Sequence, residues 1–248
     1  MANPDNPRLA VLIDADNAQA KAVHELLAEV SRYGTATVKR AYGDWTTQNL
    51  KGWKEVLHEM AIQPIQQFSY TSGKNSTDSA LIIDAMDLLH VGVVDGFCLV
   101  SSDSDFTRLA TRIREAGLPV YGFGEKKTPT AFVNACDKFI YSENLRQASG
   151  AAVDKKADPA KLKREILSAM EAVAREDGWA PLSAVGSMLV KNNPAFDARE
   201  HGFAKLGALV KSLKYLEVKE VRSNDDSPTA QWYIRPKSNA RTTAHVHP

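Results

Sequence analysis

The stretch LAVLIDADN, residues 9–17, combines an uninterrupted apolar run with two carboxylates at its end. An apolar run without alternation is typical of a strand buried on both faces, as in a parallel sheet that helices cover on its two sides. Asp14 and Asp16 follow this run directly. The stretch therefore predicts a central strand whose carboxyl end carries two like charges.

Strands and helices alternate along the first 145 residues. Apolar runs predict the strands, and apolar residues at helical spacing predict the helices between them. The predicted strands are residues 9–13, 35–43, 62–68, 97–102, 118–124 and 138–141, and the predicted helices are residues 19–33, 50–61, 77–92, 105–117 and 128–136. Pro64 places the third strand at a sheet edge, because proline cannot donate to a ladder. The alternation predicts an α/β fold with a doubly wound, mostly parallel sheet.

The pattern changes after residue 146. Residues 147–158 are rich in Ala, Ser, Gly and charge without periodicity, which predicts a linker. Helical patterns at residues 161–177, 181–192 and 202–213 then precede two strand-like segments, 215–221 and 229–235. This order is typical of a small winged helix-turn-helix domain. We therefore predict a first domain at residues 1–146, a winged-helix domain at 159–236 and a disordered tail at 237–248.

Composition places the chain among ordinary globular proteins. It has 248 residues, of which 44% are hydrophobic and 25% are charged. The two cysteines have no metal-binding spacing, and we expect buried, reduced thiols. The N-terminus lacks a signal-peptide pattern, and no apolar run reaches the roughly 18 residues that span a bilayer, so we predict a cytoplasmic protein without membrane contact.

Charge is unevenly distributed between the two halves. Residues up to Arg146 have 15 Lys and Arg against 18 Asp and Glu, a net charge of −3, whereas the remainder has 16 against 12, a net charge of +4. A basic module beside a mildly acidic one is compatible with binding of a polyanion by the second half.

Acidic residues follow a second strand in the same way. Asp103 and Asp105 end the run CLVSSDSDF, as Asp14 and Asp16 end the first one. One acid at each strand end is explained by helix capping, but capping needs only one side chain per helix. Carboxylates a few ångströms apart repel by about 4 kcal/mol per pair at an effective dielectric constant of 20. Oxygen ligands without His or Cys favour Mg²⁺ or Mn²⁺ as the neutralising ion.

A third segment, residues 70–87, brings a further acid to this edge. Asp78 lies at the predicted start of a helix, whereas Asp84 is turned well away from it by the 100° step between helical residues. Lys74 and the hydroxyls of Ser76 and Thr77 precede Asp78 and are candidates for a phosphate contact, with a solvated loop as the alternative. The segment is not a P-loop, because the upstream glycine is missing.

The motifs VLIDADN, GKNSTDSALIIDAMDLL and LVSSDSDFTRLATRIREAG, in this order, resemble the NYN domain of the LabA-like group, a branch of the PIN-like nuclease fold. The resemblance covers about residues 8–144. It implies a Mg²⁺- or Mn²⁺-dependent ribonuclease with Asp14, Asp78, Asp103 and Asp105 as metal-binding, catalytic acids. In such a site metal ions activate a water for in-line attack on a phosphodiester. Asn17 corresponds to the family's Asn after the first motif, which implies that it positions a phosphate or the water bound to the metal, with capping as its alternative role.

Residues around the acids are candidates for contact with the RNA. Lys126 and Lys127 lie in a strand-end loop on the same edge as Ser102, and Arg40 belongs to a wider set of cations near this edge. Tyr42 and Trp45 are candidates for base stacking. Most of these assignments also fit a solvated surface.

The second half resembles the LOTUS domain, also called OST-HTH, over about residues 158–236, most clearly at 196–209. The resemblance implies RNA binding, single-stranded or structured, or docking of a protein partner. Cations on the middle and third helices give a candidate phosphate-binding face with an ordinary solvated face as the alternative: Lys191, Arg199, Lys205, Lys211 and Lys214.

Two other functions fit parts of the pattern. A haloacid dehalogenase-like phosphatase also begins with Asp-x-Asp after a strand. Its pattern requires Thr or Val where this chain has Ala18, and it gives Asp78 no role. A non-catalytic RNA-binding adaptor would hold a structural ion or none at the acids. RNA cleavage that depends on the acids separates both alternatives from a nuclease.

Overall fold

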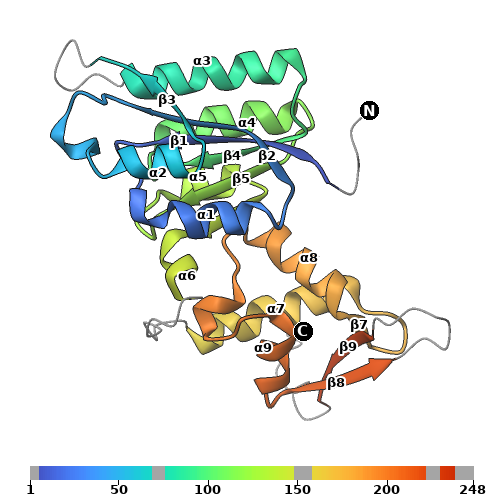
Figure 1. Ribbon diagram of the computed structural model, residues 1–248. Coiled ribbons are helices and arrows are strands. Elements are labelled where there is room, and N and C mark those ends of the chain that lie inside the picture. Colours follow the sequence, from blue (N-terminus) through green and yellow to red (C-terminus); the bar gives the residue numbers. More distant parts are fainter. Residues whose placement is uncertain (1–5, 69–75, 148–157, 222–229, 238–248) are drawn as a thin grey trace. The chain divides into compact units, whose positions relative to one another are not determined.

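The computed structural model of the protein describes residues 6–68, 76–147, 158–221 and 230–237. The chain divides into two compact units, residues 1–151 and 152–248. Figure 1 shows the elements of both units. The predicted linker and the predicted tail lie almost entirely outside the described residues.

The first unit contains six strands and six α-helices within its described residues. Its strands are β1 (Arg8–Asp14), β2 (Thr35–Gly43), β3 (Gln63–Gln66), β4 (Gly96–Val100), β5 (Val120–Gly124) and β6 (Lys138–Tyr141). Its helices are α1 (Val23–Val30), α2 (Trp53–Glu59), α3 (Ser76–Val91), α4 (Thr107–Glu115), α5 (Thr130–Ala135) and α6 (Ser142–Gln147).

All six strands form one parallel sheet in the order β3-β2-β1-β4-β5-β6. The predicted doubly wound parallel fold is therefore confirmed, with β3 at an edge as Pro64 indicates. The chain winds outward in one direction from β1 and in the other from β4, so the order reverses between these two strands. Ligands of doubly wound sheets bind beyond the carboxyl ends of the strands at such a switch point.

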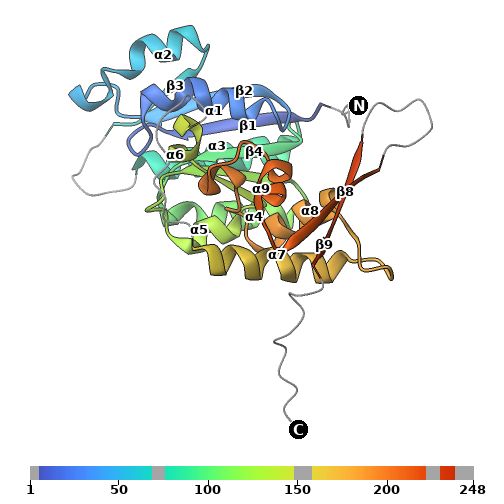
Figure 2. The same ribbon diagram turned by 90° about the horizontal axis from the view of Figure 1, so that it is seen from below.

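Helices cover both faces of this sheet, as Figures 1 and 2 show. One core joins α1, α2 and α6 to the β1 side chains of Leu9, Val11 and Ile13. The alternate β1 side chains, Ala10 and Leu12, are also fully buried. The uninterrupted apolar run of β1 thus follows from burial on two faces.

Local structure differs from the sequence prediction at several helix starts. The predicted helix 19–33 begins as a 3₁₀ turn, Ala20–Ala22, before α1, and another 3₁₀ turn, Ser104–Phe106, precedes α4. Helix α6 was not predicted, because it follows β6 without a turn signal. These differences leave the sheet order unchanged.

The second unit is a helical domain with a small sheet. Its elements are α7 (Pro159–Val173), β7 (Ala180–Pro181), α8 (Leu182–Asn192), α9 (Leu206–Ser212), β8 (Leu216–Val221) and β9 (Gln231–Pro236). The predicted hairpin of β8 and β9 is present, and β7 extends it to three antiparallel strands. The predicted helix 202–213 starts later, since Gly202 adopts a left-handed conformation (φ 83°) after a 3₁₀ turn, Ala198–His201.

Among the described residues, none of the helices has both the length and the apolar character required to cross a bilayer.

Candidate metal centre

Asp14 is the last residue of β1 and is fully buried. Its Oδ2 accepts hydrogen bonds from Asn17 Nδ2 and from Ser101 Oγ, each at 2.8 Å. Its Oδ1 is buried without a hydrogen-bond partner. Burial raises the pKa of this carboxyl, whereas the donors Asn17 and Ser101 lower it. Two donors therefore fix the Asp14 carboxylate through one oxygen, and its other oxygen has no donor.

Asp103 and Asp105 lie just beyond β4, the neighbour of β1. The Asp103 carboxylate accepts a hydrogen bond from the Asp105 backbone N–H at 2.9 Å and so caps the 3₁₀ turn before α4. The Asp103 backbone N–H donates to Ser101 Oγ at 3.1 Å. Ser101 thus contacts both strand ends. Helix capping explains one oxygen of Asp103, and it does not need a second carboxylate from Asp105.

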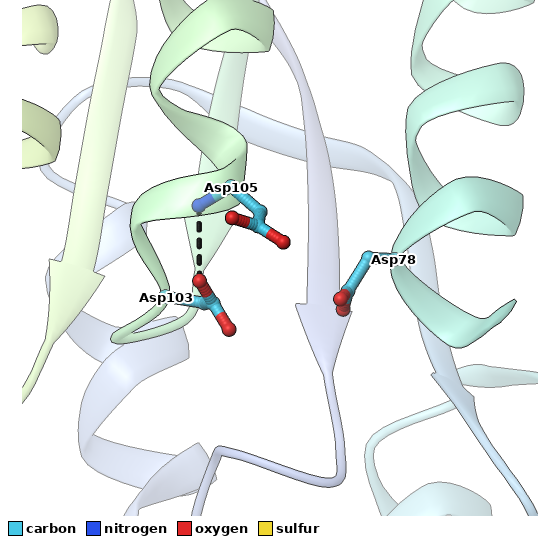
Figure 3. Close-up of side chains that lie close together, drawn as sticks. All are labelled: Asp78, Asp103 and Asp105. Atoms are coloured by element: carbon cyan, nitrogen blue, oxygen red, sulfur yellow. Dashed lines mark hydrogen bonds between the residues drawn. The ribbon is translucent and has the colours of Figure 1, made fainter. Parts of the chain in front are cut away.

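Asp78, in the first turn of α3, completes the cluster. One carboxylate oxygen from each of Asp78, Asp103 and Asp105 lies within 4.8 Å of the others. Figure 3 shows these carboxylates pointing toward a common space, with Asp78 on its helix opposite the other two. Three acids from two separate segments, the first turn of α3 and the turn after β4, therefore meet at the switch point of the sheet.

The electrostatics of Asp78 reflect this convergence. Partial burial and then the neighbouring charges, of which Asp14 acts most strongly, raise the pKa of Asp78 to about 6. Asp103, Asp105 and Asp16 act in the same direction. Asp14 thus lies close enough to influence Asp78, although it is not one of the three acids that share the common space.

The donor set fits a hard divalent cation. All the candidate ligands are carboxylate oxygens, which Mg²⁺ and Mn²⁺ prefer. A buried carboxylate oxygen without a donor, such as Asp14 Oδ1, is costly unless a positive group neutralises it. Asp78, Asp103 and Asp105 are the residues that would hold such an ion, with Asp14 beside them.

Two residues, Ser101 and Thr77, support the cluster through contacts that the sequence did not predict. Ser101 fixes Asp14, as described above. Thr77 Oγ1 donates to the Asp16 carboxylate at 3.0 Å, so the loop after β1 is tied to the first turn of α3. Serine after an apolar run and threonine before Asp78 are visible in the sequence, but nothing local shows that their partners lie 87 and 61 residues away.

The residues predicted to contact substrate lie around the same edge in varied settings. Asn17 holds Asp14, and Ser102 Oγ accepts a hydrogen bond from the Glu125 backbone N–H at 2.9 Å. Lys126 and Lys127 are exposed after β5, and Lys127 pairs with the Glu125 carboxylate at 2.8 Å. Ser76 begins α3. Lys74 lies outside the described residues.

Two residues of β2 that were candidates for contact with RNA form interactions with α3 instead. Tyr42 is fully buried and donates its hydroxyl hydrogen to Asp84 at 2.5 Å, so the prediction that it stacks on bases is wrong. Arg40 pairs with the same Asp84 carboxylate at 2.8 Å. Asp84 faces β2 rather than the acid cluster, which agrees with its helical offset from Asp78. Trp45 Nε1 donates to the Ile65 carbonyl at 3.0 Å.

The cations predicted to form a phosphate-binding face in the second unit are not equivalent. Lys191, Lys205, Lys211 and Lys214 are exposed. Arg199 differs, because its side chain is only 12% exposed and forms an ion pair with Asp197 at 2.6 Å. Lys211 Nζ lies 3.6 Å from the centre of the Trp232 ring.

Comparison with known proteins agrees with this architecture. The sequence profile of the NYN domain matches residues 8–143, and that of the OST-HTH/LOTUS domain matches residues 157–228. No curated protein matches the chain.

Solved structures give weaker similarities. A protein of unknown function from Vibrio parahaemolyticus is 18% identical over 56% of this chain and 94% of its own, with a TM-score of 0.47. An uncharacterised protein from Nitrosomonas europaea is 33% identical over 40% of this chain and 88% of its own, with a TM-score of 0.30. Residues 175–257 of a Chromobacterium violaceum protein are 39% identical over 39% of this chain and 99% of their own, with a TM-score of 0.28.

The matched profile covers more than half of the chain, and Asp78, Asp103 and Asp105 lie within the matched range. The chain belongs to the NYN domain family, a family of PIN-like nucleases, and carries an OST-HTH/LOTUS domain after its NYN domain.

Proposed function

We propose that this protein is a ribonuclease that hydrolyses RNA phosphodiester bonds at its acid cluster with Mg²⁺ or Mn²⁺, and that its LOTUS domain binds the RNA. The observation that carries the proposal is the convergence of Asp78, Asp103 and Asp105 within 4.8 Å at the switch point of the sheet. Family membership supports the nuclease class, and the all-oxygen donor set supports the metals.

The chain's own residues perform the positioning. The chemistry that a divalent cation supplies in such a site is activation of a water molecule and stabilisation of negative charge on a phosphodiester. Asp78, Asp103 and Asp105 provide the negative charge that holds the cation. Ser101 and Asn17 fix the orientation of Asp14, and the hydrogen bond from Thr77 to Asp16 fixes the first turn of α3 against the loop after β1.

The reaction requires no side-chain nucleophile. Both cysteines are buried, and burial raises the pKa of the Cys136 thiol to about 12 and that of Cys98 even further. These thiols stay protonated at neutral pH and take no part in the chemistry.

RNA cleavage assays test the proposal. End-labelled RNA is incubated with the full chain in Mn²⁺, in Mg²⁺ and in EDTA, and the same assays use single-stranded DNA. We expect metal-dependent products that Asp14→Asn combined with Asp103→Asn abolishes. Asp87→Asn is the matched control, because Asp87 is an exposed acid of α3. Cleavage that survives the double substitution would refute the proposal.

Circular RNA distinguishes the mode of cleavage. We propose an endonuclease, which linearises a circular RNA, whereas an exonuclease leaves it intact. RNA that is retained by the protein but never cut would instead identify a non-catalytic RNA-binding adaptor.

A further inference from the structure

The three-stranded sheet of the second unit has one covered and one open face. Leu216, Val218 and Ile234 point inward and pack against the core formed with α7, α8 and α9. Because side chains alternate along a strand, the residues between them point outward. Register pairs Glu217 with Arg235, and Lys219 with Tyr233, on this outer face, and Pro181 of β7 lies opposite Tyr233. The described helices of this unit, α7, α8 and α9, contribute their apolar side chains to the core on the inner face.

A tight turn adds two further side chains to the outer face. The Arg175 backbone N–H donates to the Trp179 carbonyl at 2.9 Å, and Gly178, with a φ of 78°, donates back to the Arg175 carbonyl at 2.8 Å. The Asp177 carboxylate accepts from the Trp179 backbone N–H at 3.1 Å. Trp179 immediately precedes the inward-facing Ala180 of β7, so its alternation also places it outward.

Cations and aromatic rings interleave across this face. Arg175 lies 4.9 Å from the centre of the Tyr233 ring, and Arg235 lies 4.6 Å from the centre of the Trp179 ring. Lys219 lies 5.9 Å from the same Trp179 ring. We define the stacking face as these five residues: Arg175, Trp179, Lys219, Tyr233 and Arg235.

The charge of the stacking face is positive. Among the strand residues that point outward, the described acid is Glu217, which is paired with Arg235 at 2.7 Å. The Arg235 side chain remains 43% exposed despite this pair, Lys219 and Arg175 are exposed, and both rings are partly exposed. Cation–π contacts at exposed sites are weak, so these contacts alone do not explain why two aromatic rings are left partly exposed to water on one face.

We propose that the stacking face is a binding site for single-stranded RNA, with Trp179 and Tyr233 stacking on unpaired bases and Arg175, Lys219 and Arg235 contacting phosphates. Aromatic rings interleaved with cations on an open sheet suit a single strand, because each base offers a π face and each linkage an anion. A duplex hides its base faces. The proposal deepens the RNA-binding role proposed above and assigns it to the sheet rather than to the predicted lysines of the helices.

Binding of a labelled 12-nucleotide RNA to the full chain tests this inference. The chain carries Asp14→Asn and Asp103→Asn, so cleavage does not interfere. We expect Trp179→Leu with Tyr233→Leu to weaken binding by at least about tenfold, because each stacked base is lost. Trp179→Phe with Tyr233→Phe keeps both rings and should stay within about threefold of the parent.

Two controls define the site. Lys191→Gln with Lys205→Gln removes two exposed cations from the helical side and should weaken binding less than about threefold. An abasic oligonucleotide of equal length carries the same phosphates and should bind at least about tenfold more weakly than the RNA. Equal binding by the abasic strand, or a loss confined to the lysine variant, would overturn the inference.

Photochemical crosslinking of bound RNA keeps the test independent of variant folding. The Asp14→Asn, Asp103→Asn chain is irradiated with bound RNA, and mass spectrometry should place crosslinks on the peptides that contain Trp179 or Tyr233. Crosslinks confined to other peptides would contradict the stacking face. Binding and crosslinking do not depend on hydrolysis, so they test the stacking face alone. If the ribonuclease proposal is wrong, the unsubstituted chain leaves RNA uncut whether or not the stacking face binds it.

Discussion

Thr77 donates a hydrogen bond from its hydroxyl to the Asp16 carboxylate across 3.0 Å, and this contact joins the loop after β1 to the first turn of α3. Thr77 is buried, whereas Asp16 is exposed. The next residue after Thr77 is Asp78, so the contact sets where the Asp78 carboxylate enters the cluster. We therefore expect Asp16 to act by positioning Asp78, although it belongs to the same Asp-x-Asp pattern as Asp14.

Thr77→Val should weaken Mn²⁺ binding by about tenfold, the lower end of the effect of residues that orient metal ligands. The substitution keeps the shape of the side chain and removes only the hydroxyl. Isothermal titration calorimetry on the full chain measures the affinity. Thr77→Ser keeps the hydroxyl and should bind Mn²⁺ as the unsubstituted protein does. Equal affinity of the valine and serine variants would show that Thr77 does not position Asp78.

Asp78→Asn should stabilise the metal-free protein at pH 7 by about 1–3 kcal/mol, because a carboxyl with a folded pKa of about 6 is ionised there against its surroundings. A raised carboxyl pKa means that the folded state binds more protons than the unfolded state, so stability falls as pH rises from about 4 to 6. The gain should therefore disappear at pH 4. Urea unfolding in EDTA at both pH values measures it.

The control for this pH dependence is Asp87→Asn, on the exposed side of the same helix. Asp87→Asn removes the same charge without reducing the repulsion among the clustered acids. The free energy of unfolding should therefore change only slightly, and by the same amount at both pH values. A stability gain for Asp78→Asn that persists unchanged at pH 4 would mean that repulsion between the acids is not its cause.

Ser101→Ala should destabilise the protein by about 1–3 kcal/mol, because it removes one of the two donors to the fully buried Asp14 carboxylate. Urea unfolding at pH 7 measures the change. The neighbouring Ser102→Ala is the control, since Ser102 accepts from the partly exposed Glu125 backbone N–H and should cost less than half as much. A larger loss at Ser102 would contradict the assigned role of Ser101.

The sequence was sufficient to predict the sheet and the general position of the acids. The apolar run of β1 and the alternation of strands and helices indicate parallel strands, whose carboxyl ends lie on one edge. Asp14, Asp78, Asp103 and Asp105 follow from that edge together with the family resemblance. Local sequence predicts these features because they depend on burial and on helix geometry, which the spacing of apolar residues shows directly.

Side-chain contacts between residues far apart in the sequence could not be predicted from the sequence. The contact of Ser101 with Asp14 spans 87 residues, and that of Tyr42 with Asp84 spans 42. Tyr42 is polar enough for a surface and apolar enough for a core, and only the position of α3 decides between them. The stacking face is similar, because Arg175, Lys219 and Arg235 meet their rings only after β7, β8 and β9 have paired.

Gly124→Ala should destabilise the protein by about 1–3 kcal/mol, because a Cβ at this position would lie 2.5 Å from the Ser101 carbonyl oxygen. That oxygen belongs to the backbone, so the ends of β4 and β5 would have to separate, and the donor to Asp14 would move with them. Urea unfolding gives the stability, and Mn²⁺ titration should show weaker binding in the same variant. Gly52→Ala is the control, since a Cβ there meets nothing within 4 Å and should be neutral. If Gly124→Ala matches Gly52→Ala in both measurements, the close packing of the two strand ends does not support the metal centre.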